Sequence, residues 1–324
     1  MNPRLMTQVL FATDFSDDAA RAQEYAMYLA TAWDATLQVL HVIEAPAWFN
    51  ANAATLAIME QARAEAAQRL DRVNDQMRRS GVTVTVRQVL GAPHEQISRV
   101  SREQGADLIV LGTQGRTNLL YGLLGSTAER VVKDAPCPVL AVPGTRPLAG
   151  KPIAPTPALP IRHIMVPVDF SSPALDAVEY AIQLAQSLGS NMTLLHVLET
   201  TSHDLECGLG NIEQERSKRD HWNKHLADLT ELVASCGLSA GFEISGGLPS
   251  EAILAAALRH KVDLLVMGTH GRRGISDWRF GSVAEAVLRR ATCPVWTVKT
   301  PKFEPGHRRV VPQTIEETEI KGAE

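Results

Sequence analysis

The chain contains two copies of one unit, and this internal repeat limits the possible folds more than any other feature. The segment VLFATDFSDDAARAQEYAMYLA aligns with IMVPVDFSSPALDAVEYAIQLA, and later blocks repeat in the same order. The offset is 155 residues between Asp14 and Asp169 and 156 residues between Gly112 and Gly268. A repeat of this length predicts two domains of the same fold.

A proline-rich stretch separates the two copies. Proline fixes φ and removes a hydrogen-bond donor, so residues 144–160 are predicted to form an extended linker. The predicted domains are residues 1–143 and 161–300. Residues 301–324 are polar and interrupted by proline, which predicts a mostly disordered tail or one that wraps loosely over the surface.

Strand and helix signals alternate within each copy. Ser16 is a predicted N-cap, Pro93 is placed where a first helical turn tolerates proline, and ADLIVLG has the apolar run of a strand buried on both faces. Five strands alternating with four helices imply right-handed crossovers and a parallel sheet. The predicted strands of the first copy are 7–13, 36–42, 82–89, 106–112 and 138–142, and its helices cover 16–33, about 50–79, a short stretch from 93, and 126–135.

Composition excludes several classes of protein. Hydrophobic residues make up 45% and charged residues 21%, which is typical of a globular chain with a core. The net charge of −4 does not indicate a nucleic-acid-binding surface. The longest apolar runs are too short to span a membrane, and the N-terminus lacks the pattern of a secretory signal peptide. We therefore expect a cytoplasmic protein that binds neither membranes nor nucleic acids.

The four cysteines give no disulfide or redox framework. Cys137, Cys207, Cys236 and Cys293 include no C-x-x-C pair. Cys137 and Cys293 each stand before an apolar run, so both are predicted to be buried small hydrophobic residues.

A glycine frame occurs once in each copy, directly after the fourth predicted strand. GTQGRTNLLYGLLGS and GTHGRRGISDWRFGS share the spacing Gly-x2-Gly-x9-Gly-Ser. Glycine lets a ligand approach the backbone closely, and the helix that follows offers unpaired N–H groups suited to phosphate. The serine hydroxyl either donates to phosphate or caps the helix. The fixed positions are Gly112, Gly115, Gly125 and Ser126 in the first copy, and Gly268, Gly271, Gly281 and Ser282 in the second.

Further polar residues are predicted to join the glycine frame at the carboxyl ends of the strands. Asp14 and Asp169 end the first strand of each copy, where a carboxylate can accept hydrogen bonds from ribose hydroxyls or help to order a metal ion. Arg116 and Arg272 follow the second glycine and can pair with phosphate charge. The loop of the first copy is apolar and that of the second is polar, which predicts that the two sites differ.

At these residues the chain resembles the universal stress protein family in its tandem two-domain form, with an ATP-binding type of glycine motif in both domains. The resemblance implies two doubly wound, Rossmann-like domains of the adenine-nucleotide α-hydrolase type. Each would have a five-stranded parallel sheet flanked by helices, with the domains paired by a pseudo-two-fold axis through strands 138–142 and 294–298. It leaves a homodimer open. It also implies ATP with Mg²⁺ or Mn²⁺, Asp14 and Asp169 as the site's acids, and adenine at the backbone of Val42 and Val197.

Three functions are compatible with the sequence. The first is a stress-response sensor or regulator that acts through nucleotide occupancy and partner binding. The second is a slow ATPase, for which Gln114 and His270 are the only side chains placed to orient water; no strong catalytic motif is present, so no catalytic residue is assigned. The third is a scaffold with degenerate sites, against which the two intact frames argue.

One histidine cluster belongs to none of these functions. His203, Cys207, His221 and His225 lie between the second strand and the long helix of the second copy. His221 and His225 share a helix face and could bind Zn²⁺. A polar helix surface is the favoured interpretation, so no metal ligand is assigned.

Overall fold

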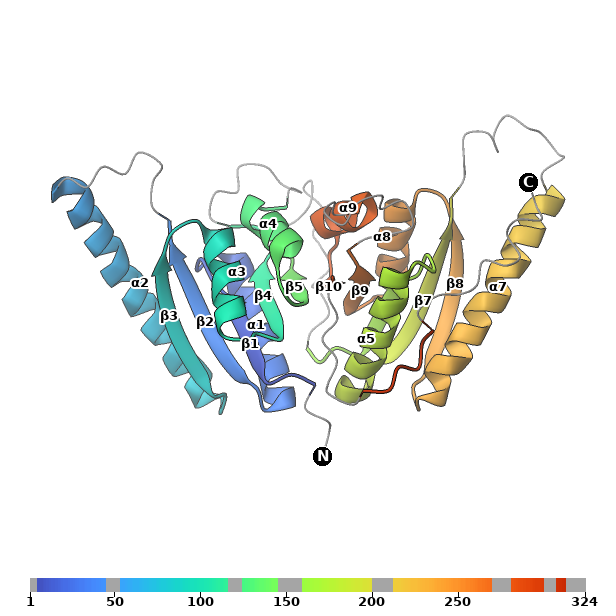
Figure 1. Ribbon diagram of the computed structural model, residues 1–324, viewed down its shortest axis with the longest axis horizontal. Helices are drawn as coiled ribbons and strands as arrows, with labels where there is room; N and C mark the ends of the chain where they lie inside the picture. The colour runs from blue at the N-terminus through green and yellow to red at the C-terminus, as the bar shows by residue number, and fades with distance from the viewer. Residues whose placement is uncertain are drawn as a thin grey trace. The chain divides into compact units, whose positions relative to one another are not determined.

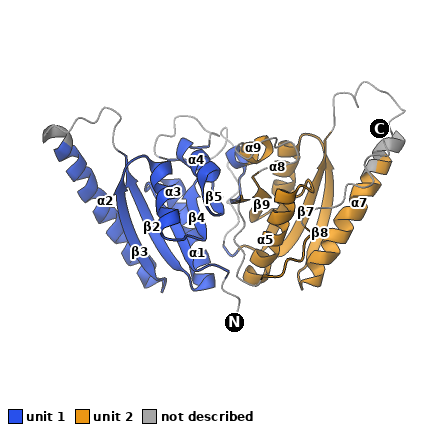
Figure 2. Ribbon diagram, in the orientation of Figure 1, with its two compact units in different colours: residues 1–160, 288–296 blue, residues 161–287, 297–324 orange. Residues whose placement is uncertain are grey.

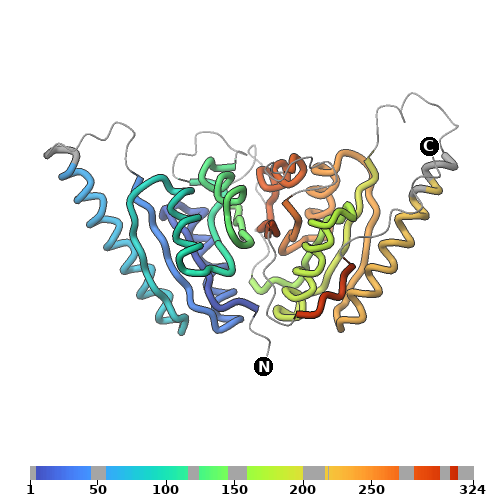
Figure 3. Tube along the Cα trace, in the orientation of Figure 1, coloured from blue at the N-terminus to red at the C-terminus, as the bar shows by residue number. Residues whose placement is uncertain are grey.

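The computed structural model describes residues 5–44, 53–115, 124–144, 159–199, 212–269, 281–299 and 307–312. Strands alternate with helices within each repeat, and the strands form parallel sheets flanked by helices (Figures 1 and 3). The fold class predicted from the repeat, two tandem α/β domains with parallel sheets, is confirmed.

The described residues of the first repeat form five strands and four helices. In Figure 1, α3 and α4 lie together on one face of its sheet and α1 lies on the other. The elements are β1 (Gln8–Ala12), α1 (Asp17–Trp33), β2 (Thr36–Ile43), α2 (Ala53–Arg79), β3 (Val84–Leu90), α3 (Pro93–Glu103), β4 (Leu108–Gly112), α4 (Ser126–Asp134) and β5 (Val139–Val142).

The second repeat has the same order of elements. They are β6 (His163–Pro167), α5 (Ser172–Leu188), β7 (Asn191–Leu198), α7 (Ile212–Ser235), β8 (Ala240–Gly246), α8 (Pro249–Arg259), β9 (Leu264–Gly268), α9 (Ser282–Arg290) and β10 (Val295–Val298).

The strand order places a switch point inside each sheet. The first repeat has the order β3-β2-β1-β4-β5, and the second has the equivalent order β8-β7-β6-β9-β10. All pairings of β1 are parallel, with Val9 opposite Leu37 on one side and Leu108 on the other. Successive strands are therefore added on one side of β1 up to β3 and on its other side from β4 onward, so the switch in strand order lies between β1 and β4. Ligands of such sheets bind at the carboxyl ends of the strands beside this point.

Contacts between residues divide the chain into two compact units (Figure 2). One comprises residues 1–160 with 288–296, and the other comprises residues 161–287 with 297–324. The end of α9 and the start of β10 are thus grouped with the first unit. Within that unit, the rings of Trp33 and Trp296 meet edge to face, with 6.4 Å between their centroids.

Local sequence signals explain where several elements begin. The Ser16 hydroxyl accepts a hydrogen bond from the Ala19 N–H at 3.2 Å, and Ser171 caps α5 in the same way. Pro93 opens α3, where its missing N–H costs nothing. Four of the five residues of β4 are buried, as expected of a central strand covered on both faces.

Other expectations have mixed outcomes. Cys137 and Cys293 are buried and unbridged, as predicted, whereas Cys207 lies outside the described residues.

The described part of the tail is packed more closely than the sequence suggested, because Val311 is only 1% exposed. Among the helices that the structure describes, none is both long and apolar enough to cross a bilayer.

Candidate nucleotide site

The turn after the first strand orients the acid that the sequence singled out. In the first repeat, Asp14 Oδ1 accepts a hydrogen bond from the Ser16 N–H at 3.0 Å. In the second repeat, Asp169 Oδ1 accepts from both the N–H and the hydroxyl of Ser171, at 3.0 and 2.6 Å. An aspartate that bonds to the backbone two residues later makes a fixed local turn. Both carboxylates are therefore held at the carboxyl end of the first strand.

A phenylalanine with an unusual backbone conformation follows each of these acids. Phe15 has φ 62° and Phe170 has φ 61°, which are uncommon values for residues other than glycine. Their rings lie beside His41 and His196, at centroid distances of 4.5 and 5.5 Å. Sequence reasoning missed this feature, although the repeated Asp-Phe-Ser was its visible signal. Left-handed conformations of bulky residues cluster at functional sites.

The buried histidine of the second strand ties the first two strands together at this edge. His41 Nδ1 lies 2.7 Å from the carbonyl oxygen of Thr13, and His196 Nδ1 lies 2.7 Å from that of Val168. Val42 and Val197, the residues expected to meet adenine, come next in β2 and β7 and are half-buried. The structure therefore places Asp14 and Val42 at the ends of adjacent strands, with Asp169 and Val197 equivalent in the second repeat.

The first glycine of the frame is required by helix packing. A Cβ placed on Gly112 would lie 2.9 Å from the carbonyl carbon of Asp18 in α1. A Cβ on Gly268 would lie 2.7 Å from the carbonyl oxygen of Pro173 in α5. Both separations are too short for real atoms, and both neighbours are backbone atoms. Glycine at these positions lets the helix that follows the first strand approach the end of the fourth strand.

The second glycine faces the site itself. A Cβ on Gly115 would lie 2.9 Å from Asp14 Oδ2, the carboxylate oxygen that does not accept from Ser16 N–H. The structure thus brings together two residues that are about a hundred positions apart in sequence. Gly271, the equivalent glycine of the second repeat, lies outside the described residues.

The third glycine starts a helix without a side-chain cap. Gly125 is the N-cap of α4, where no side chain accepts a hydrogen bond, and its N–H donates to the Thr113 carbonyl at 2.7 Å. The Gly281 N–H makes the same bond to Thr269 at 2.8 Å. Ser126 is the exposed first residue of the helix and not its cap, so of its two predicted roles only donation to a ligand remains open. The first turn of α4 retains the partial positive charge that suits phosphate.

A buried aspartate anchors the frame in the first repeat. Asp18 is 3% exposed, and its Oδ2 accepts a hydrogen bond from the Gln114 N–H at 3.1 Å. A Cβ on Gly144 would collide with Asp18 Oδ1, so the backbone after β5 also lies against this carboxylate. Pro173 occupies the equivalent position in the second repeat and offers no carboxylate. Sequence reasoning missed Asp18, because the acid is present in only one copy.

Replacement of Asp18 by alanine is expected to lower the free energy of unfolding by about 1–3 kcal/mol, because the Gln114 N–H loses its acceptor. The matched control is Asp17→Ala in the same first turn. Asp17 is exposed and shares only the interaction with the helix dipole, worth less than about 1 kcal/mol. Urea unfolding of both variants gives the comparison. Equal losses would contradict a role for the buried hydrogen bond.

Carboxylates lie around the first site in the described residues, together with basic side chains such as Lys133 and Arg69. Asp14 and Asp18 lie at the glycine frame, and Glu129 is in the first turn of α4. A hydrogen bond from Lys133, at 2.6 Å, lowers the pKa of Glu129 and keeps that carboxylate ionised. Carboxylates next to a phosphate cradle repel phosphate unless a cation lies between them. Arg116 and Arg272, the predicted phosphate partners, lie outside the described residues, as does His270.

The aromatic surroundings of the two repeats differ. Arg69 of α2 lies over the Phe15 ring, 5.6 Å from its centroid. In the second repeat, Trp222 of α7 instead stacks on Phe170 at 4.9 Å and lies 4.6 Å from the His196 ring. The turn that carries Asp169 is therefore covered by a tryptophan, where the first repeat has an arginine.

The two described histidines of the predicted zinc cluster belong to this aromatic packing. The His221 and His225 rings are 4.4 Å apart, and each lies against Trp222. Both are half-buried, and the favoured interpretation of a polar helix surface stays a prediction. His203 and Cys207 lie outside the described residues, within which no group of three metal-binding side chains occurs.

These features define the class of protein: tandem Rossmann-like α/β domains, each with a switch point in the strand order of its parallel sheet. The universal stress protein family model matches residues 6–143 and 160–299. The chain therefore belongs to the universal stress protein family.

The chain is also similar to individual members of this family. A universal stress protein of Methanocaldococcus jannaschii is 34% identical over 140 residues, which is 43% of this chain and 82% of the relative. The solved structure of a universal stress protein from Archaeoglobus fulgidus covers 92% of this chain and 98% of its own, with a TM-score of 0.68 and 22% identity. A universal stress protein solved in complex with cAMP is 27% identical and covers 43% of this chain and 97% of its own, with a TM-score of 0.34.

Proposed function

We propose that each half of this stress-response protein binds an adenine nucleotide, ATP with Mg²⁺ or Mn²⁺, and that occupancy of the sites regulates the protein. One observation carries the proposal. In the first repeat, the carboxylate of Asp14 lies so close to Gly115 that a Cβ there would be only 2.9 Å from Oδ2. The same loop leads to a helix whose first turn has no side-chain cap. An acid and an anion-binding helix start at a switch point suit a nucleotide.

The proposed contacts follow from the chemistry of each group. Asp14 and Asp169 accept hydrogen bonds from ribose hydroxyls, and the backbone of Val42 and Val197 meets the adenine edge. Phosphates lie against the glycine frames and the N-termini of α4 and α9, where the Ser126 and Ser282 hydroxyls add donors. Arg116 and Arg272 are proposed to pair with phosphate charge.

A divalent cation fits this set of residues. Mg²⁺ is commonly held by one or two carboxylates together with substrate phosphates, and it retains several waters. Asp14 offers hard oxygen ligands near the frame, and the cation would offset the repulsion between phosphate and the nearby acids. When bound, the cation would neutralise part of the phosphate charge and orient the phosphates.

Regulation requires that the nucleotide binds one conformation of the protein more tightly than another. The proposed contacts come from separate elements: the turn after β1, the end of β2, and the loop between β4 and α4. A bound nucleotide would hold these elements in one arrangement and so favour one surface for a protein partner. A domain pair built through the fifth strands, alone or within a homodimer, remains part of this proposal.

A slow ATPase is the second candidate function. The Gln114 N–H is held by Asp18, which fixes the backbone of a residue placed to orient water. A scaffold with degenerate sites is the third candidate, and it predicts that no nucleotide binds.

Titration with ATP and Mg²⁺ by calorimetry, together with phosphate release, distinguishes these functions. We expect saturable ATP binding with turnover below about one per minute, and weaker binding of cAMP, which lacks the β and γ phosphates. Faster turnover that is lost in Gln114→Ala would favour the ATPase. The absence of binding at millimolar ATP would favour the scaffold.

A further inference from the structure

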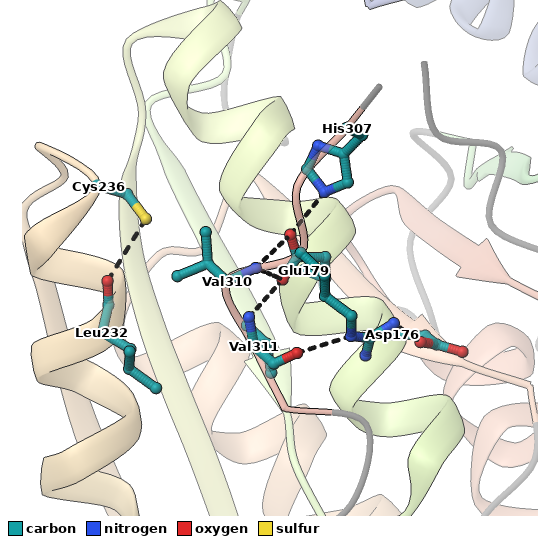
Figure 4. Close-up of polar contacts among 8 residues, drawn as sticks. Asp176, Glu179, Leu232, Cys236, His307, Val310 and Val311 are labelled. Carbon is teal, nitrogen blue, oxygen red and sulfur yellow. Dashed lines mark hydrogen bonds and ion pairs between the residues drawn. The ribbon is translucent and has the colours of Figure 1, made fainter. Parts of the chain in front are cut away.

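Part of the C-terminal segment is docked on α5 in the second unit (Figure 4). Glu179 of α5 is fully buried, and its carboxylate accepts hydrogen bonds from the backbone N–H of Val311 at 2.7 Å and of Val310 at 3.2 Å. His307 Nε2 lies 2.7 Å from the Glu179 Oε1 atom. One buried carboxylate therefore binds three groups of a segment that lies about 130 residues further along the chain.

A second acid on the same helix face binds the arginine of this segment. Arg309 forms an ion pair with Asp176, one helical turn before Glu179, and its Nε donates to the Val311 carbonyl at 2.6 Å. The Val311 side chain is 1% exposed. The segment is thus held through a charged side chain, backbone N–H groups and one buried apolar side chain.

The burial of Glu179 makes the contact specific. A buried carboxylate is strongly unfavourable unless hydrogen bonds compensate for the lost water. Here the compensating donors include two consecutive backbone N–H groups, which a bend in a peptide backbone can direct at one carboxylate. The position is therefore suited to a peptide backbone.

The repeat provides an internal comparison. Glu24 in α1 occupies the position equivalent to Glu179, yet Glu24 is exposed. Arg21 occupies the position of Asp176, so the charge that would pair with an incoming arginine is reversed. The acid pair and its burial are features of the second repeat alone.

We propose that Asp176 and Glu179 form a peptide-docking site on α5 that takes a basic segment through one arginine and two consecutive backbone N–H groups. The chain's own residues 307–312 are its resident ligand. Because this ligand is tethered, its effective concentration reaches the millimolar range, and it excludes free peptides of the same chemistry until it is displaced. The site is independent of the nucleotide proposal.

Hydrogen exchange of the full chain tests the resident contact. The amides of Val310 and Val311 are expected to exchange at least about tenfold more slowly than in an unstructured peptide. Glu179→Gln and Arg309→Ala should each remove most of this protection, whereas Glu24→Gln should leave it unchanged. Arg309→Ala alters only the tail and cannot unfold the core. Absence of protection in the wild type, or unchanged protection in both tail-site variants, would overturn the proposal.

Binding of a labelled peptide of residues 307–312 tests the site in trans. Val311→Asp places a second carboxylate beside Glu179 and should release the tail of the full chain. Fluorescence anisotropy is then expected to show at least about tenfold tighter peptide binding to Val311→Asp than to the wild type. A peptide that carries Arg309→Glu should bind far more weakly. Equal binding to both proteins, or equal binding of both peptides, would refute the site.

Discussion

Replacement of Gly115 by valine should abolish nucleotide binding in the first half of the protein and leave its fold intact. The new Cβ would lie 2.9 Å from Asp14 Oδ2 and displace the carboxylate that we propose binds the nucleotide. The neighbouring atom is the far end of a flexible side chain, so the protein can adjust. We expect at least about 100-fold weaker binding at this site, equivalent to about 2.8 kcal/mol. Calorimetry should show the loss of one binding site per chain.

The control is Gly241→Val, which adds the same side chain in the edge strand β8. A Cβ on Gly241 has no atom within 4 Å. This variant should bind ATP as the wild type does. Denaturant unfolding should show that both variants keep the wild-type free energy of unfolding to within about 1 kcal/mol. Normal ATP binding by Gly115→Val at both sites would contradict the site assignment.

Replacement of Gly268 by alanine should mainly lower the free energy of unfolding, whereas Gly115→Val should mainly weaken nucleotide binding. Its Cβ would lie 2.7 Å from the Pro173 carbonyl oxygen, and a backbone atom cannot move away at low cost. Overpacking of this kind lowers the free energy of unfolding by about 1–3 kcal/mol. Urea unfolding measures the effect, which should be present without any nucleotide.

Gly246→Ala is the matched control for this second prediction. Gly246 has no neighbour within 4 Å of a Cβ position, so alanine there should be neutral or stabilising by up to about 1 kcal/mol. Two glycine-to-alanine changes in the same repeat should therefore differ in sign. If Gly268→Ala were as stable as Gly246→Ala, close packing of α5 against the end of β9 would not explain the first glycine of the frame.

Much of the fold could be predicted from local signals. The strands of the first repeat begin and end within a few residues of their predicted bounds, because apolar runs, the Ser16 cap and Pro93 act locally. The duplication then predicted the second repeat from the first. The approach of Asp14 to the glycine frame was also expected, because carboxyl ends of parallel strands share one edge of a sheet.

The features that could not be predicted depend on tertiary contacts. Gly112 and Gly115 look equivalent in the frame, but one faces a helix backbone and the other faces a carboxylate. The positive φ of Phe15 has only the repeated Asp-Phe-Ser as its signal, and that repeat does not specify a backbone conformation. Val311 stands in a polar stretch, and its burial depends on Glu179 in a distant helix. Sequence spacing cannot reveal such partners.

The most direct test of the central proposal is the number of adenine nucleotides bound per chain. Equilibrium dialysis of the full-length protein against ATP and Mg²⁺ measures it without assuming any enzymatic activity. We expect two nucleotides per chain at saturation, bound with different affinities, and one in Gly115→Val. If no adenine nucleotide were bound at millimolar ATP, the chain would not be a nucleotide-binding protein.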